Sequence, residues 1–365
     1  MAKTSPKPRT LGELRQSEYQ ALPVKEEMRK NLIRKLRENQ PIFPGIVGYD
    51  DTVIPQIENA VLSGQDIIFL GERGQAKTRM ARSLIHLLDE EIPVIKGSEV
   101  NDDPYAPISA EGRRLLEEHD DLVEIEWVPR EARYGEKLAT PDITVADLIG
   151  DVDPIKVAEG RYLSDELTIH YGLLPRTNRG IFCINELPDL AERVQVGLLN
   201  VLEERDVQIR GYKVRLPLDV YLVASANPED YTNRGRIITP LKDRAGSQIR
   251  THYPATLDQE IDIMDQERLS FPTPGYEVDV PQYMKEIVAE VTHLARRHPD
   301  ISQRSGVSVR VSISNYENLM SNALKRGIRI NEHRVVPRIS DLGALISSTA
   351  GKIEVESVGD VKEDK

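Results

Sequence analysis

The sequence predicts an α/β protein in which a parallel sheet carries helices on both faces and is followed by a smaller helical domain. Short apolar runs typical of buried strands occur at Asp66–Leu70, Ile181–Asn185 and Val220–Ala224. Segments with apolar residues at helical spacing, such as Thr78–Leu88 and Ala191–Glu204, lie between them. Strands that alternate with helices favour a parallel sheet covered on both faces. After about residue 256 the strand pattern fades and helical periodicity continues alone.

Composition sets the outer limits of the function. The chain has 365 residues, of which 39% are hydrophobic and 30% charged, as in a soluble globular protein of two or three domains. No apolar run approaches the roughly 20 residues of a membrane span, and the N-terminus lacks the apolar core of a signal peptide. The single cysteine, Cys183, excludes an intrachain disulfide, and the seven histidines form no metal-ligand pattern. We therefore expect a cytoplasmic protein with no membrane contact.

The charge is unevenly distributed along the chain. The formal net charge of −12 argues against a general nucleic-acid-binding role. Residues 1–40 nevertheless hold ten Lys or Arg and five Glu. A solvated helix and tail explain this basic excess most simply, and a contact with an acidic partner or a neighbouring subunit is the alternative.

The two ends of the chain differ in pattern. Residues 1–22 are polar, with several Pro and Ser, and we expect them to be loosely ordered. Pro23 is expected to open a helix that ends before Pro41 and Pro44. That helix has one apolar stripe, formed by Met28, Leu32 and Leu36.

The C-terminal region reads as helical throughout. Tyr316–Arg326 is expected to form a helix that Gly327 stops, because glycine is the usual residue after a helix end. An earlier helix is indicated by the helical spacing of Met284, Ile287, Val288, Val291 and Leu294.

A phosphate-binding loop is predicted between the first strand and the following helix. Residues 71–78, GERGQAKT, approximate the pattern G-x-x-x-x-G-K-[ST] in the strand–loop–helix context that a P-loop requires. Backbone N–H groups and the helix N-terminus would hold the phosphates, Lys77 would reach the β- and γ-phosphates, and the Thr78 hydroxyl would bind Mg²⁺. Ala76 replaces the second glycine, as in the similar loop of MCM helicases; an ordinary turn with an exposed lysine is the alternative. The expected phosphate-binding residues are Gly71, Glu72, Arg73, Gly74, Gln75, Ala76, Lys77 and Thr78.

The strand Gly180–Asn185 resembles a Walker B strand, in which an apolar run ends in acidic residues. Open α/β sheets bind ligands at this carboxyl edge. Glu186 is the candidate base that orients or polarises the attacking water, and a solvated loop carboxylate is the alternative. Asn185 stands where Asp is usual; its amide can accept a hydrogen bond from a Mg²⁺-bound water but contributes no charge to the cation. Asp189 is near enough in sequence to substitute.

Two segments resemble the sensor elements of AAA+ ATPases. Val220–Asn227 resembles the sensor 1 strand, which implies that Asn227 holds the attacking water; alternatively, Asn227 and Pro228 only start a turn. Residues 306–310, GVSVR, resemble the sensor 2 segment of MoxR-like proteins. This implies that Arg310 contacts the γ-phosphate, and a surface salt bridge is the alternative.

A third segment resembles the arginine that acts between subunits. Residues 241–246, LKDRAG, are similar to the L-x-D-R-F-G segment of magnesium-chelatase I and MoxR proteins, with Ala245 in place of the usual Phe. The resemblance implies that Arg244 reaches the neighbouring subunit's site and neutralises charge on the transferred phosphoryl group. Arg234 and Arg236 are near enough to share this role.

The order of these segments resembles that of AAA+ ATPases, and in particular of magnesium-chelatase I subunits and MoxR-like proteins. Residues 46–49, IVGY, resemble the adenine-side motif, which implies nucleotide contacts at Val47 and Gly48. Segments around 139–141, 148–153 and 172–175 resemble a helix-2 insertion, and 202–217 a pre-sensor-1 hairpin. The resemblance implies a polar N-terminal arm and helix at 1–40, a three-layer αβα AAA+ core at 41–255 and a helical lid at 256–365.

The resemblance also implies a mechanism. ATP and Mg²⁺ would bind at subunit interfaces of a homo-oligomeric ring, expected to be hexameric, and hydrolysis would drive a partner protein that carries a von Willebrand A domain. Metal insertion and chaperone-like remodelling are both compatible with it. An MCM-like DNA motor and a nucleotide-gated scaffold with low turnover are the alternatives. The acidic net charge argues against a nucleic-acid partner and therefore against the DNA motor.

Overall fold

The computed structural model describes residues 7–152, 168–204, 206–209, 212–227, 235–299, 301 and 306–353. The chain divides into two compact units. Unit 1 comprises residues 1–44, 54–70 and 78–249, and unit 2 comprises 45–53, 71–77 and 250–365. Among the described helices, none is both long enough and apolar enough to cross a membrane.

Unit 1 is built around a five-stranded sheet with the order β11-β1-β10-β7-β4. Strand β10 pairs in parallel with both β1 and β7, and β7 pairs in parallel with β4. Every residue of the central strands β7 and β10 is buried, as their continuous apolar runs predict for strands covered on both faces. The strands are β1 (Ile67–Leu70), β4 (Tyr134–Leu138), β7 (Gly180–Asn185), β10 (Val220–Ala226) and β11 (Ser247–Arg250).

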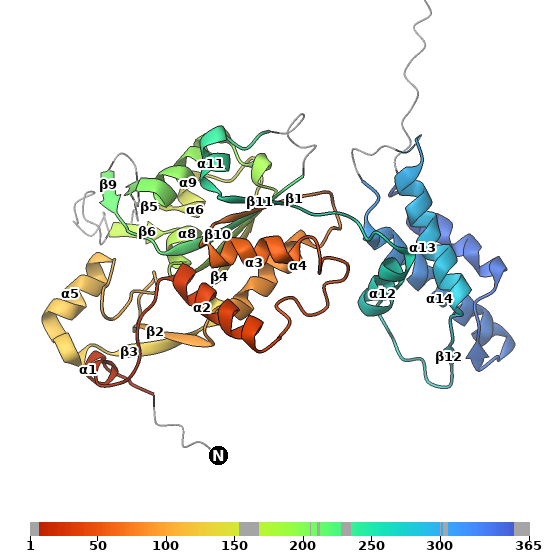
Figure 1. Ribbon diagram of the computed structural model, residues 1–365, viewed down its shortest axis with the longest axis horizontal. Helices are drawn as coiled ribbons and strands as arrows, with labels where there is room; N and C mark the ends of the chain where they lie inside the picture. Colours follow the sequence, from red (N-terminus) through yellow and green to blue (C-terminus); the bar gives the residue numbers. More distant parts are fainter. Residues whose placement is uncertain are drawn as a thin grey trace, which may run out of the picture. The chain divides into compact units, whose positions relative to one another are not determined.

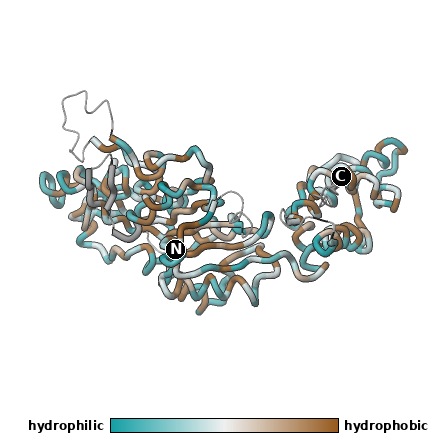
Figure 2. The backbone as a smooth tube through the Cα atoms, turned by 90° about the horizontal axis from the view of Figure 1, so that it is seen from above, coloured by the Kyte–Doolittle hydropathy of each residue, from teal (hydrophilic) through white to brown (hydrophobic). Residues whose placement is uncertain are grey.

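Helices cover both faces of this sheet, as the alternating sequence pattern predicts (Figure 1). In that view α9 (Glu192–Glu204) and α11 (Thr239–Arg244) lie above the sheet, and α2 (Val24–Arg37), α3 (Ile54–Leu62) and α4 (Lys77–Ser83) lie below it. Alternate strand residues point to opposite faces, so each face has its own core. The core shared with α9 and α11 includes Ile68, Phe182, Ile184, Val194, Leu198, Leu241 and Ala245. Hydrophobic and hydrophilic stretches alternate along the backbone of both units, as expected when each element buries one side (Figure 2).

The segment between the P-loop and β7 contains strand pairs that the sequence pattern did not reveal, and one more pair follows β7 where a hairpin was expected. Strands β2 (Glu91–Ile95) and β3 (Ile125–Pro129) form an antiparallel pair, with α5 (Ala110–His119) between them in the chain. Short strands β5 (Gly150–Val152) and β6 (Ile169–Tyr171) form another antiparallel pair where the helix-2 insertion was expected. Strands β8 (Asp206–Ile209) and β9 (Tyr212–Arg215) pair antiparallel within the segment expected to be a hairpin.

The N-terminal arm is more ordered than its composition predicted. Helix α1 (Leu11–Arg15) begins after Thr10, whose side chain accepts a hydrogen bond from the Glu13 backbone N–H. Leu11 and Leu14 are fully buried and pack against Ile95 and neighbouring residues of the β2–β3 pair. The expectation of loose order for residues 1–22 was therefore wrong for this helix, because two buried leucines outweigh a polar composition.

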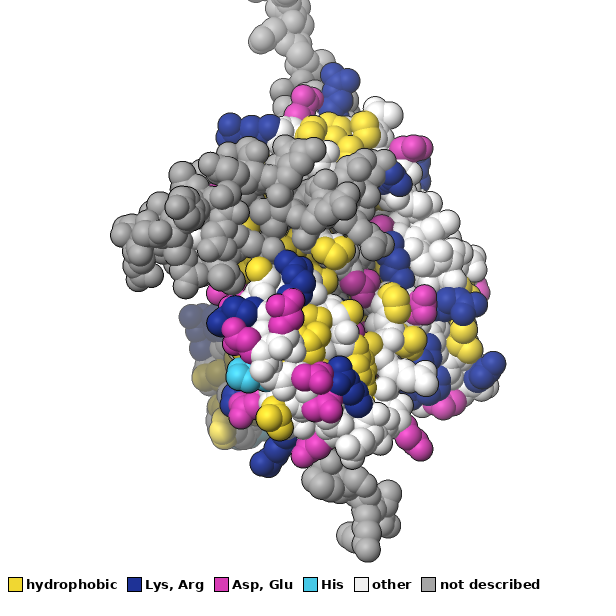
Figure 3. Space-filling model, turned by 90° about the vertical axis from the view of Figure 1, so that its left-hand side faces the viewer, with side chains coloured by type: hydrophobic (Ala, Val, Ile, Leu, Met, Phe, Trp, Pro, Cys, Tyr) yellow, Lys and Arg dark blue, Asp and Glu magenta, His cyan; other side chains and the backbone are white. Residues whose placement is uncertain are grey.

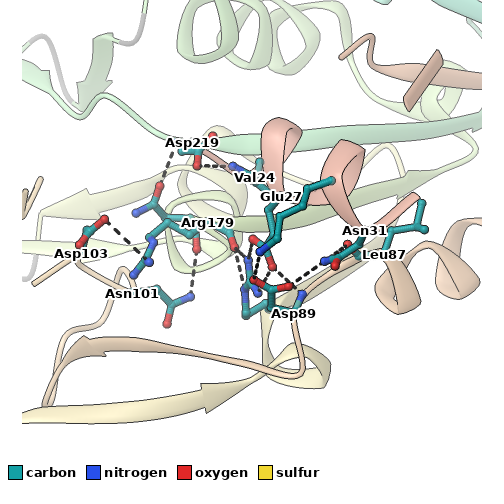
Figure 4. A network of polar contacts seen from close by, with 12 residues as sticks. Val24, Glu27, Asn31, Leu87, Asp89, Asn101, Asp103, Arg179 and Asp219 are labelled. Atoms are coloured by element: carbon teal, nitrogen blue, oxygen red, sulfur yellow. Dashed lines mark hydrogen bonds and ion pairs between the residues drawn. The ribbon is translucent and has the colours of Figure 1, made fainter. Parts of the chain in front are cut away.

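A buried ion pair fixes helix α2 to the sheet (Figure 4). The Arg133 and Glu27 side chains are 0% and 4% exposed and form two parallel hydrogen bonds of 2.8 and 2.6 Å. Arg133 also donates two hydrogen bonds to the backbone carbonyl of Arg179. Glu27 Oε1 also accepts a hydrogen bond of 2.6 Å from the backbone N–H of Asp89. Every charge in this pair therefore has a partner, which a buried pair needs in order to be stable.

The same network extends to the first residue of α2. The Asp219 carboxylate accepts a hydrogen bond of 2.7 Å from the backbone N–H of Val24, and the Asp219 carbonyl accepts one from Arg179. Arg133, Arg179 and Asp219 directly precede β4, β7 and β10. The network therefore lies at the amino edge of the sheet, which leaves the opposite, carboxyl edge for ligands.

The surface of unit 1 carries mixed charges. On the face shown in Figure 3, Lys and Arg side chains alternate with Asp and Glu side chains. Arg114 pairs with Glu111 and Glu118 along α5, and Arg15 pairs with both Asp120 and Asp121. Among the side chains described on this face, we see no extended basic area of the kind that nucleic-acid binding requires.

Unit 2 is mainly helical. Its helices α12 (Leu257–Glu267), α13 (Gln282–Arg297) and α14 (Val309–Ile330) bury a common core of Ile261, Met264, Met284, Val288, Tyr316 and Leu319. The remaining elements are β12 (Glu277–Val278), β13 (Arg334–Val335), a 3₁₀ helix at Ile339–Leu345 and α15 (Ile346–Thr349).

The expected end of the last long helix at Gly327 was wrong. Helix α14 continues to Ile330 and ends at Asn331, which has the left-handed backbone φ of 56°. Gly327 is buried inside the helix, where an added Cβ would collide with the side chain of Val335. The glycine therefore permits the close approach of β13 to the helix, and asparagine, which tolerates the left-handed region, ends the helix.

Candidate functional site

The predicted phosphate-binding loop connects β1 to α4. Two of its residues, Gly74 and Ala76, have left-handed backbone φ values of 80° and 55°. Lys77 is only 7% exposed, and its Nζ donates hydrogen bonds to the backbone carbonyls of Gly71 and Glu72. The Gln75 Oε1 accepts a hydrogen bond of 3.0 Å from the backbone N–H of Glu72. The loop thus curls around its own lysine, as a P-loop does, and the alternative of a simple turn with an exposed lysine is not what the structure shows.

The two glycines of the loop are required by close packing within unit 2. A Cβ on Gly74 would collide with the Ser308 side chain, and a Cβ on Gly71 would collide with Thr251. Thr251 Oγ1 donates a hydrogen bond of 2.6 Å to Gln75 Oε1. The Tyr253 hydroxyl donates one of 3.0 Å to the Arg73 carbonyl. The outer side of the loop is therefore held by residues that lie far away in the sequence.

Ala76 occupies a backbone conformation that favours glycine. We expect Ala76→Gly to raise the free energy of unfolding by about 0.5–1 kcal/mol. The left-handed region costs a residue with a Cβ about 1–2 kcal/mol, and the greater unfolded-state entropy of glycine offsets about 0.4–1 kcal/mol of that gain. Urea denaturation measures the difference. Ala81→Gly, in the middle of α4, is the matched control and should lower stability; a loss of stability in Ala76→Gly would contradict the strain argument.

The expected adenine-side residues also belong to unit 2. The Tyr49 hydroxyl lies 3.0 Å from the Gln75 carbonyl oxygen and 2.7 Å from that of His252. Burial raises the pKa of Tyr49 to about 12, so the hydroxyl remains a donor. Gly48 has a left-handed φ of 81°, and an added Cβ would lie 3.0 Å from the Gln259 side chain. Val47, which precedes it, is half-buried. Tyr49 thus ties the adenine-side segment to the phosphate-binding loop.

A second group of predicted residues meets at the carboxyl edge of the sheet in unit 1. Thr78 Oγ1 donates a hydrogen bond of 3.3 Å to the side-chain oxygen of Asn185, the last residue of β7. Ser225, on the neighbouring strand β10, donates another of 3.3 Å to the same oxygen and accepts one of 3.2 Å from the Glu186 backbone N–H. Glu186 itself has left-handed angles, φ 55° and ψ 49°. Such strain in a non-glycine residue is typical of functional positions, where the side chain must leave the strand at a set angle.

Sequence reasoning missed two members of this group, Glu136 and Arg82. Glu136 Oε1, on β4, accepts a hydrogen bond of 2.7 Å from the Asn185 amide nitrogen. Arg82, on α4, binds both oxygens of Glu136, at 2.7 and 2.9 Å. The hydrogen bonds from Arg82 lower the pKa of Glu136, which keeps the carboxylate ionised. The sequence held no signal for this contact, because Glu136 and Asn185 are 49 residues apart and Glu136 lies in a strand with mixed polarity.

The donor atoms at this edge suit Mg²⁺. Hydroxyl, amide and carboxylate oxygens are hard ligands of the kind that Mg²⁺ prefers, and Mg²⁺ takes few ligands from the protein when it is bound together with phosphates. Thr78 and Asn185 place two such oxygens next to each other. Within the described residues no group of three or more His, Cys, Asp or Glu could form a self-contained metal site. Cys183 is fully buried, and burial raises its pKa to about 12, so it is unsuited to act as a nucleophile.

The remaining predicted residues lie at element ends. Asn227 is buried directly after β10, and Asp189 is half-buried just after Glu186. Arg244 is exposed as the last residue of α11, and Arg236 is also exposed. Arg310 is exposed in the first turn of α14, whose N-cap is Ser308. Arg234 and Asp153 lie outside the described residues. Ala245, which replaces the family's Phe, is buried in the core shared with α9.

Comparison with known proteins gives a match to one family model and similarity to magnesium-chelatase subunits. The family model of the sigma-54 interaction domain matches residues 159–241. The magnesium-chelatase subunit ChlI of Mesostigma viride is 28% identical over 250 residues, which cover 64% of this chain and 63% of that protein. The subunit ChlI of Nephroselmis olivacea is 24% identical over 336 residues, which cover 84% and 87%. A structure of the complex between subunits BchI and BchD of magnesium chelatase is 20% identical, covers 87% of this chain and 97% of the matched chain, and has a TM-score of 0.44.

The fold and the site define the class of the protein. A parallel sheet covered on both faces, a P-loop after β1, polar residues at the end of β7 and a helical C-terminal region are the features of an AAA+ P-loop protein. Within that class, the chain is related to the magnesium-chelatase I subunits, at low sequence identity. The resemblance to AAA+ and magnesium-chelatase I proteins drawn from the sequence is thereby confirmed. The chain spans a little under two thirds of the Mesostigma viride subunit.

Proposed function

We propose that the chain is a Mg²⁺-dependent ATPase that binds ATP through residues 71–78 and hydrolyses its β–γ bond. The observation that carries this proposal is the buried Lys77, enclosed by the carbonyls of its own loop at the start of α4. A lysine ammonium held at the start of a helix after a glycine-rich loop is the arrangement that recognises the β- and γ-phosphates. The pair of oxygens of Thr78 and Asn185 is the support for Mg²⁺ at the same end of α4.

Each residue of the carboxyl edge has a role in this proposal. Mg²⁺, when bound, would neutralise phosphate charge during transfer. Thr78 and Asn185 would hold it. Glu186, set at an angle to its strand by its left-handed backbone, would accept a proton from the attacking water. Asn227, buried at the end of β10, would orient that water.

The arginines are assigned to coupling between parts of an assembly. Arg244 is exposed at the end of α11, so it can enter the site of a neighbouring copy and stabilise charge in the transition state. Arg310, in the first turn of α14, would report the nucleotide state to the helical unit. We further propose a ring of copies that acts on a partner with a von Willebrand A domain, in metal insertion or MoxR-like remodelling. The support is the relatedness to ChlI and a matched structure that pairs BchI with BchD.

Phosphate release with Mg²⁺, measured across protein concentrations, tests the proposal. The wild type should turn over ATP, and the rate per subunit should rise with concentration, because Arg244 acts on a neighbouring copy. Lys77→Ala should lose nucleotide binding, whereas Arg79→Ala, an exposed position on the same helix, should keep it. Failure of the wild type to bind ATP would refute the proposal. Binding without turnover at every concentration would instead support the nucleotide-gated scaffold.

A further inference from the structure

Asn185 is held in one orientation by groups of known polarity. An ionised carboxylate only accepts hydrogen bonds, so the Glu136 oxygen, 2.7 Å away, must face the amide nitrogen of Asn185. The amide oxygen then faces the hydroxyls of Thr78 and Ser225, each 3.3 Å away. The amide therefore forms a bridge: its donor end binds a carboxylate, and its acceptor end binds the hydroxyl expected to hold Mg²⁺.

An aspartate at position 185 would not fit beside Glu136. It would bring a carboxylate oxygen to within 2.7 Å of another, and two carboxylates at that distance cannot both stay ionised. The pair accommodates one negative charge, and in this chain the charge is on β4 and the amide is on β7. The Asn185 amide thus donates a hydrogen bond to the Glu136 carboxylate. The acidic group expected at the end of β7 is present on the adjacent strand β4, one hydrogen bond away from Asn185.

Helix α4 holds both ends of this arrangement. Thr78 and Arg82 are four residues apart, which places them on the same face of the helix. The Thr78 hydroxyl donates a hydrogen bond to Asn185. One turn later, Arg82 donates hydrogen bonds to both carboxylate oxygens of Glu136. The Arg82 side chain is 63% exposed and that of Glu136 21%, so solvent screens the arginine more than the carboxylate. Arg82 thereby fixes the direction of the Glu136 carboxylate.

We propose that Glu136 supplies the negative charge for Mg²⁺ that Asn185 lacks, and that it acts through the Asn185 amide as a positioning residue. The carboxylate polarises the amide, whose oxygen becomes the stronger acceptor toward a Mg²⁺-bound water. The inference rests on the proposed ATPase function. It assigns a role to a strand, β4, that carries none of the residues expected from the sequence.

A charge swap tests this assignment. The affinity for a non-hydrolysable ATP analogue is measured by isothermal titration calorimetry with Mg²⁺ and with EDTA, and the ratio of the two affinities is the Mg²⁺ enhancement. Glu136→Gln should lower the enhancement by about 10- to 100-fold, the usual effect of losing a group that supports a metal ligand, and leave the EDTA affinity unchanged. The double variant, Glu136→Gln with Asn185→Asp, restores one charge and one amide and should recover most of the enhancement.

The controls separate this inference from the function on which it rests. Glu131→Gln, an exposed position before β4, should behave as the wild type. A wild type whose analogue binding does not respond to Mg²⁺ overturns the proposed function together with this inference. A wild type with a clear enhancement that Glu136→Gln retains, or a double variant no better than Glu136→Gln, overturns only the role of Glu136. Thermal unfolding identifies a variant that does not fold. If Glu136→Gln does not fold, Glu136→Asp is measured in its place; it keeps the charge and should retain most of the Mg²⁺ enhancement.

Discussion

Glu186→Gln is expected to keep ATP binding and to lower turnover by about 10²- to 10⁴-fold, the contribution of a positioned general base. Glutamine has the same shape and can keep the same left-handed backbone, φ 55°, so the site geometry should survive. Its amide cannot take the proton from the attacking water. Single-turnover phosphate release with enzyme in excess measures the chemical step directly, and analogue titration measures binding.

A nearby carboxylate provides the control for this variant. Glu192→Gln alters an exposed residue at the start of α9 and should leave turnover unchanged. If Glu186→Gln turned over ATP within threefold of the wild type, the role of base would pass to another group, and Asp189 is the nearest candidate in the sequence.

Removing one partner of the Glu27–Arg133 pair is expected to lower the free energy of unfolding by about 3–5 kcal/mol, because the other charge is left buried and unpaired. Both side chains are almost completely buried. Arg133→Met also frees the Arg179 carbonyl and Glu27→Gln disturbs the bond to the Asp89 N–H, so the damage reaches the segment before β7 and the segment before β2. Urea denaturation followed by circular dichroism gives the change for unit 1.

The double variant Glu27→Leu with Arg133→Met distinguishes the pair from its parts. With both charges gone, no unpaired charge remains buried, so the loss should be much smaller than the sum of the single losses. Arg114→Ala, which breaks an exposed pair on α5, should give no measurable change. Single variants that unfold at the wild-type urea concentration would show that the pair is not what holds α2 to the sheet.

The fold was predictable where the information is local. Strands β7 and β10 are buried on both faces, so their sequences are continuous apolar runs that mark them without reference to the rest of the chain. Strand β4 lies at the end of the sheet order and is only partly buried. Its sequence, YGEKL, therefore carries no clear periodicity, and with it Glu136 stayed hidden.

The sequence by itself determined the strand–loop–helix of residues 67–83, the polar end of β7 and the order of the segments, because a P-loop and its helix are contiguous and their chemistry depends on residue types at fixed spacing. Only the tertiary structure decided which carboxylate accompanies Asn185, since parallel pairing of β4 with β7 brings together residues 49 positions apart. It also decided that Leu11 and Leu14 are core residues and that Gly327 lies inside a helix. In each case the deciding contact comes from a distant segment, and long-range packing leaves no mark in the local pattern of the chain.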